Sequence, residues 1–119
     1  MGKVATNAII DGGLDKVATC TTLTVCAGQP TSYADIAVRA LASVTIDSGD
    51  FTKSDGDTSG RKVTVAQQTD MAIDTSGTAD HVAIDDGTDY VITTATSQAL
   101  TDTGTVTVPV FDYEISDPA

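Results

Sequence analysis

The sequence has few of the side chains that bind polyanions or cross membranes. Its 119 residues include six Lys or Arg, of which Arg61 and Lys62 form the one adjacent pair. Phosphate recognition needs clustered basic residues, so nucleic acid is excluded as a partner, and so is an anionic membrane surface. No apolar run approaches the roughly 18–20 residues of a membrane span. The first residues contain no long apolar segment, which predicts no signal peptide and synthesis in a cytoplasm.

Residues that perform catalysis are equally scarce. The chain has no Trp, five aromatic residues and one histidine, His81, and it contains no Gly-x-Ser-x-Gly elbow and no Gly-rich phosphate loop. We therefore expect a non-enzymatic protein with no catalytic and no cofactor-binding residue, and we interpret His81 as an ordinary strand histidine. Paired carboxylates for sugar cleavage are disfavoured because such enzymes need aromatic platforms in a deep cleft.

Two further patterns raise the question of a thiol or metal site. Cys20 and Cys26 are six residues apart, which fits no zinc pattern, and their surroundings are Thr-rich and uncharged. We expect two small buried residues, or one buried and one exposed, and the sequence leaves open whether they are free or paired. Asp55 and Asp57 resemble the opening of a calcium loop, but the closing position is Ala66 instead of Glu. This favours a polar loop and predicts no bound metal.

The residues present in excess are aspartate and threonine. Seventeen acidic residues against six basic ones give a net charge of −11, and sixteen of the acids are Asp. The chain also contains 21 Thr. Asp favours caps and turns, whereas β-branched Thr suits a pleated surface. The composition predicts one loop-rich, mainly β domain spanning residues 1–119, whose acid gives solubility or complements a basic partner.

One helix is expected near the start of the chain, over residues 7–17. Its large apolar residues recur at helical spacing and form one stripe: Ile10, Leu14 and Val17. Gly12 and Gly13 weaken this helix by up to about 1 kcal/mol each relative to Ala. The helix therefore depends on docking, either to its own domain or to a neighbouring subunit, and the stripe is our candidate interface.

The rest of the chain predicts six or seven strands and one further helical turn. The alternating apolar segments are 21–26, 41–46, 62–66, 71–73, 81–84, 90–93 and 105–115. Their spacing of about ten residues is typical of a β-sandwich or an open barrel. Ser32 and Asp35 form a capping pattern for the helical turn, and residues 47–60 are expected to form a polar loop anchored by Phe51.

Two turn signals refine this expectation. Asp86-Gly87 lies between two β-rich runs and predicts a hairpin, because both residues tolerate positive φ. Pro109 interrupts the last strand, and a bulge or kink there would keep Val106, Val108 and Val110 on the core face together with Phe111, Tyr113 and Ile115.

The succession of these segments resembles a family of small virion proteins of tailed bacteriophages. The resemblance covers nearly the whole chain in matching order and rests on five segments: Thr6–Asp11 (TNAIID), Leu23–Ala34 (LTVCAGQPTSYA), Asp55–Val65 (DGDTSGRKVTV), Gly77–Asp85 (GTADHVAID) and Val108–Pro118 (VPVFDYEISDP). It implies capsid or tail assembly and no catalysis. Gly12 and Gly13 depart from the better helix formers expected at their positions.

This resemblance sets the functional expectation. We expect a capsid decoration (cement) protein that binds the outer shell, with the major capsid protein and further copies of itself as partners. A trimer is expected because phage shells offer repeated three-fold positions. The protein would then be made in the host cytoplasm and reside on the capsid exterior. The alternative is a tail, adaptor or fibre-associated module for host attachment or tail assembly.

Overall fold

The computed structural model describes residues 7–57 and 60–115. Within these ranges the chain is mainly β, with nine strands, two α-helices and one 3-10 turn, which confirms the predicted class with its short N-terminal helix. The elements in chain order are α1 (Asn7–Val17), β1 (Thr22–Cys26), α2 (Tyr33–Arg39), β2 (Ala40–Thr45), η1 (Ser48–Asp50), β3 (Phe51–Asp55), β4 (Arg61–Val65), β5 (Gln68–Ala72), β6 (Gly77–Asp85), β7 (Tyr90–Leu100), β8 (Thr105–Val108) and β9 (Phe111–Ile115).

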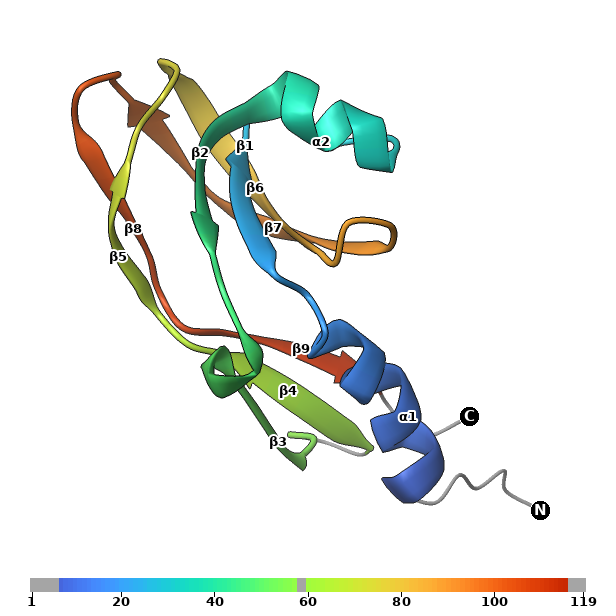
Figure 1. Ribbon diagram of the computed structural model, residues 1–119. Helices are drawn as coiled ribbons and strands as arrows, with labels where there is room; N and C mark the ends of the chain where they lie inside the picture. Colours follow the sequence, from blue (N-terminus) through green and yellow to red (C-terminus); the bar gives the residue numbers. More distant parts are fainter. Residues whose placement is uncertain (1–6, 58–59, 116–119) are drawn as a thin grey trace.

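The strands form three antiparallel sheets that curl round one core (Figure 1). The largest sheet has the order β2-β1-β6-β7, a second has the order β3-β4-β9, and β5 pairs with β8. Ala42 of β2 forms an isolated bridge with Ile73, just after β5. The β5-β8 pair therefore continues the large sheet beyond β2, and the result is a barrel that stays open between β7 and β8.

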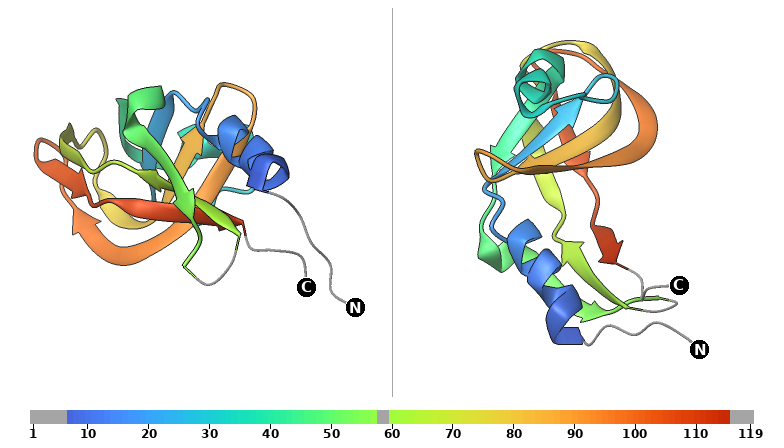
Figure 2. Two further views of the ribbon diagram at one scale, coloured as in Figure 1. Left: turned by 90° about the horizontal axis from the view of Figure 1, so that it is seen from below. Right: turned by 90° about the vertical axis from the view of Figure 1, so that its right-hand side faces the viewer.

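One hydrophobic cluster joins the three sheets and α1. Leu14, Leu23, Val63 and Val65 are fully buried, and the same cluster includes residues of β5, β6 and β8. The molecule measures 54 × 27 × 25 Å with a radius of gyration of 15.1 Å, against about 13.5 Å for a compact chain of this length. It is therefore elongated, with α2 at one end and α1 at the other (Figure 2).

The candidate interface stripe lies inside this core. Ile10, Leu14 and Val17 are 5%, 0% and 7% exposed, because α1 packs against β4. A Cβ atom on Gly13 would lie 3.0 Å from Cδ1 of Ile115, so the glycine permits close contact between helix and β9. The helix docks on its own domain, and a partner cannot contact the stripe without displacing it.

The region from residue 47 to residue 60 is more ordered than a polar loop. Asp47 caps η1 by accepting a hydrogen bond from the backbone N–H of Gly49, and β3 follows directly. β3 pairs in register with β4, and Phe51 is half-buried against the main core. The predicted Phe51 anchor is confirmed, but the absence of a strand was wrong, because pairing with β4 orders a segment that lacks an apolar pattern.

The kink at Pro109 is confirmed, and it divides the last strand between two sheets. Val106 and Val108 are buried in β8, while Phe111 of β9 is half-buried against the core. Val110 was wrongly expected on the core face and is 56% exposed, because it lies in the break where the chain leaves β5 for β4.

The predicted hairpin is also confirmed and joins β6 to β7. Its turn spans four residues, and the Asp86 carboxylate accepts hydrogen bonds from the backbone N–H groups of Thr88 (2.9 Å) and Asp89 (2.8 Å). Gly87 has a φ of 95°, which disfavours any residue with a Cβ atom. The side chain of Asp86 and the backbone of Gly87 therefore determine the turn together.

Two glycine substitutions isolate the effect of the backbone φ angle on stability, because neither added Cβ atom meets a neighbouring atom. Gly87→Ala should lower the free energy of unfolding by about 1–2 kcal/mol through the positive φ alone, because nothing lies within 4 Å of the added Cβ atom. Gly12→Ala is the matched control: its Cβ atom also meets open space, but in a helix, so stability should rise by about 0.5–1 kcal/mol. Urea unfolding of both variants measures this, and equal effects of the same sign would contradict it.

Candidate functional site

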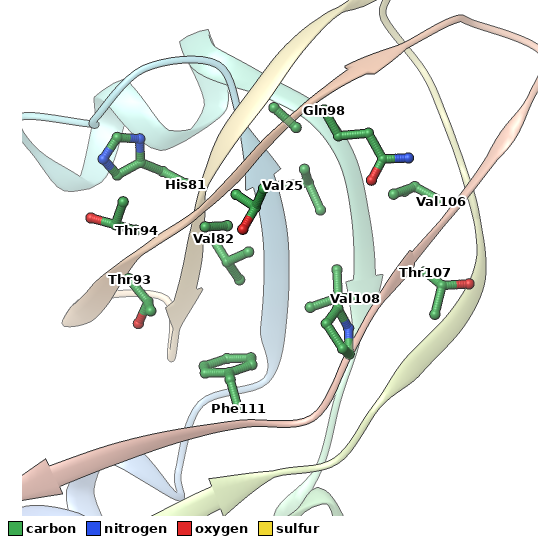
Figure 3. Close-up of a pocket in the computed structure, with 14 residues that line it drawn as sticks. Val25, His81, Val82, Thr93, Thr94, Gln98, Val106, Thr107, Val108 and Phe111 are labelled. Atoms are coloured by element: carbon green, nitrogen blue, oxygen red, sulfur yellow. The ribbon is translucent and has the colours of Figure 1, made fainter.

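A groove lies between β7 and β8 (Figure 3). Its volume is about 370 Å³, which lies within the usual range of ligand pockets. Val25, Val82 and Val108 form an apolar floor, and Thr94, Thr96 and Thr107 contribute hydroxyl groups. The groove is thus the gap of the open barrel, lined by small apolar and neutral polar side chains.

An irregularity in β7 widens this gap. The register passes from Ala79↔Gln98 to His81↔Thr94, so three residues of β7 lie opposite the single residue Asp80 of β6. Extra residues of this kind bend a strand and increase its twist. Beyond the bend β7 pairs with β6 again, from Gln98 to Leu100, before the turn 101–104 leads into β8.

Both sides of the groove are strand edges. β7 ends the large sheet, and β8 pairs with β5 alone among the residues that the structure describes. From Val91 to Leu100, β7 contains no charged residue and no proline. β8 is shorter and is followed by Pro109, which has no N–H to donate. The β7 edge thus has a row of backbone groups without strand partners, while the β8 edge is partly blocked.

His81 lies on the rim of the groove, where it contacts Asp80. Its Nδ1 atom is 2.7 Å from Oδ1 of Asp80, and that same carboxylate oxygen accepts a hydrogen bond of 2.7 Å from the backbone N–H of Gly28. The neighbouring His81 and the Gly28 N–H together lower the pKa of Asp80. Within the described residues His81 has no hydrogen bond to a hydroxyl group, and the pair joins β6 to the loop after β1.

The two cysteines are free and buried. Cys20 is 4% exposed and Cys26 is not exposed. Burial raises the pKa of each thiol to about 11, and for Cys20 the nearby Asp86 carboxylate adds to the effect. Since the thiolate is the reactive form, both side chains behave as small apolar core residues, the first of the two alternatives that the sequence left open.

Thiol labelling tests this burial. At pH 8 a pKa of about 11 leaves roughly a hundredfold fewer thiolates than an ordinary cysteine has, so the folded protein should react very slowly with an aromatic disulfide reagent. Both thiols should react rapidly after unfolding in guanidinium chloride. Rapid labelling of either thiol in the folded state would contradict the buried arrangement.

The acidic pair that resembled a calcium loop is engaged in ion pairs. Asp55 lies 2.8 Å from Arg61, and Asp57 lies 2.8 Å from Lys62. In the described ranges, which omit residues 58–59, no group of three or more His, Cys, Asp or Glu is arranged to hold a metal ion. The two carboxylates therefore neutralise adjacent basic side chains.

Ion pairs of this kind involve every Lys and Arg that the structure describes. The paired cations are Lys16, Arg39, Lys53, Arg61 and Lys62. Three of the five lie at α1: Lys16 belongs to the helix, Arg61 contacts Asp11 at 2.9 Å, and Lys53 contacts Asp15. Residues 63–119 contain ten acids and no Lys or Arg. All the residues that line the groove except Val25 come from this half of the sequence.

Lys16 ties α1 to the hairpin turn. Its ammonium group is 2.7 Å from Asp86 and 3.3 Å from Asp89. The Lys16 ammonium, together with the N–H groups of Asp89 and Thr88, holds the pKa of Asp86 well below its usual range. The same contact with Asp86 raises the pKa of Lys16. This ion pair is one direct electrostatic link between the N-terminal helix and the large sheet.

The depressed pKa of Asp86 predicts a specific acid dependence of stability. The folded state favours the carboxylate, so its contribution is present above the ordinary Asp pKa of about 3.9 and is lost as the pH falls toward the lower folded-state value. Asp86→Asn should be less stable than the native protein at pH 7, and the difference should shrink below about pH 4. Urea unfolding across this range measures it, with the more exposed Asp89→Asn as the matched control.

The candidate interface predicted from the sequence and the groove in the structure are different surfaces. The helical stripe 10–17 is internal, whereas the groove joins residues of β1, β6, β7, β8 and β9 that no local pattern brings together. Two signals were available in the sequence: the uncharged run 91–100 and the absence of basic residues after Lys62. Neither signal places β7 beside β8, because that placement depends on the pairing of β5 with β8.

In the described residues, no helix combines the length and the apolar character needed to cross a membrane. Comparison of the chain with protein-family models, with curated protein sequences and with solved structures found no match. Function is therefore inferred from the chain's own residues and from the resemblance of its segments.

Proposed function

We propose that this protein is a non-enzymatic structural component of a tailed-bacteriophage virion, a decoration protein that binds the outer capsid surface and stabilises the shell. The family resemblance supplies the setting. The observation that carries the binding role is the open barrel, whose uncharged β7 edge borders a groove in the purely acidic half of the chain. Such a surface is equipped for association with another protein.

The placement of the reactive side chains supports a non-catalytic role. His81 and Asp80 hold the loop at Gly28, and the thiols of Cys20 and Cys26 are buried and protonated. Each of these groups already has a structural partner or environment. In this proposal the protein acts by binding through complementary surfaces. Symmetry repeats each contact over the shell, so a single contact can be modest.

The charge distribution supports a basic partner surface. The described cations are neutralised within the chain, and the half beyond Lys62 has carboxylates without basic residues of its own. Long-range attraction between the acidic protein and a positive surface speeds their association. In this proposal the partner is the major capsid protein, with further copies of the chain, as a trimer, on the same shell.

The alternative is a tail, adaptor or fibre-associated module. The elongated body, 54 Å long, is compatible with such a position. Copy number separates the two functions, since the shell repeats each binding position by its symmetry and a tail has few equivalent positions.

Purified particles test the proposal directly. Quantitative gel densitometry should give on the order of hundreds of copies per particle, and a particle map should place the chain on the outer shell. Because the partner contact is electrostatic, the protein should dissociate as salt rises from about 0.1 M to about 1 M, where the Debye length falls from about 10 Å to about 3 Å. A few copies confined to the tail would favour the alternative, and absence from particles would refute both.

A further inference from the structure

The outer edge of β7 lacks the charges and the proline that commonly protect an exposed strand. Natural edge strands carry charges or proline, contain bulges, or are kept short, because their free N–H and C=O groups pair readily with other chains. β7 is eleven residues long and, from Val91 to Leu100, has no charge and no proline, and its one bulge opposite Asp80 leaves regular strand on both sides. The neighbouring β8 shows the contrast, with four residues followed by Pro109.

The groove beside this edge has the side-chain lining that an added strand needs. A strand presents its side chains alternately to two faces. Along β7 the exposed Thr94, Thr96 and Gln98 offer neutral polar contacts, while the buried Val82 and Val108 provide an apolar floor. A segment that alternates small apolar and hydroxyl side chains matches both surfaces (Figure 3).

Charge at the two ends of β7 indicates which strand fits. Asp89 precedes β7 and is largely exposed, although it also contacts Lys16 at 3.3 Å, and Asp102 lies in the turn beyond the other end. A second copy of this chain would bring the same acids to the same edge, and like charges would oppose the pairing. A segment with basic residues at both ends would meet both carboxylates.

We infer that the β7 edge binds an extended segment of a partner protein, whose centre is uncharged and β-branched and whose two ends carry Lys or Arg. The segment adds as a further strand to the large sheet and occupies the opening of the barrel, which is the β-augmentation mode of recognition. The assignment of this segment to the capsid protein rests on the proposed function. The recognition chemistry does not depend on that function.

A synthetic peptide tests the recognition with the full chain. The probe is acetyl-Lys-Lys-Val-Thr-Val-Thr-Val-Lys-Lys-amide, whose length of about nine residues spans most of β7 at about 3.3 Å per residue. In amide NMR spectra of the labelled protein, resonances of β7 and β8 should shift, and β7 amides should exchange more slowly with solvent. A peptide with Glu in place of every Lys should bind at least about tenfold more weakly at low salt.

Two matched double variants separate the effect of the charges at the ends of β7 on peptide affinity from the effect of the protein's net charge. Asp89→Asn with Asp102→Asn should weaken binding of the Lys peptide about tenfold or more. Asp55→Asn with Asp57→Asn changes the net charge equally, but at β3 and the turn after it, and should leave the affinity within about twofold. A third peptide with Pro at the central Val should lose binding, because Pro cannot donate a ladder hydrogen bond.

Three results would overturn the inference. One is the absence of β7 shifts with the Lys peptide up to about 1 mM. A second is equal weakening by both double variants, which would indicate non-specific attraction. The third is a concentration-dependent dimer whose β7 amides are protected without peptide, which would make a second copy the occupant. Each of these leaves virion incorporation unaffected, so failure here is distinguishable from failure of the proposed function.

Discussion

The docking of α1 against β4 and β9 is the interaction on which the other features depend. The core contains few aromatic side chains, and burying each large residue of the helical stripe contributes about 1.5–3 kcal/mol. Gly13 permits this contact because a larger residue would press on Ile115. Arg61 and Lys53 then pair with carboxylates on the outer side of the helix. A helix that is weak in isolation thus becomes one end of the core.

The same docking determines the polarity of the surface. Three of the five described cations, Lys16, Lys53 and Arg61, lie at α1, where they neutralise acids of the helix, of β3 and of the hairpin. The half of the chain after Lys62 supplies acids but no Lys or Arg. The acidic charge that composition assigns to the whole protein is therefore partly neutralised around the helix.

The barrel remains open because β7 and β8 do not pair. The extra residues of β7 opposite Asp80 bend that strand, and Pro109 ends β8 after four residues, so neither strand is shaped to close the sheet on the other. An open edge is a hazard in an abundant protein unless it has a partner or a charge that rejects copies of itself. The exposed β7 edge has an acid beyond each end, Asp89 and Asp102, and an uncharged centre.

The sequence by itself determined the class of fold, the helix over residues 7–17, the hairpin at Asp86-Gly87 and the kink at Pro109. These features follow from local spacing, from the φ preference of glycine and from the missing N–H of proline. Tertiary structure decided that Ile10, Leu14 and Val17 face the core, that β3 is a strand, and that β7 and β8 border a groove. An apolar stripe shows that a helix face will be buried, but it does not show which surface covers that face. A groove between distant strands has no local sequence pattern. Both features depend on contacts between residues far apart in the chain.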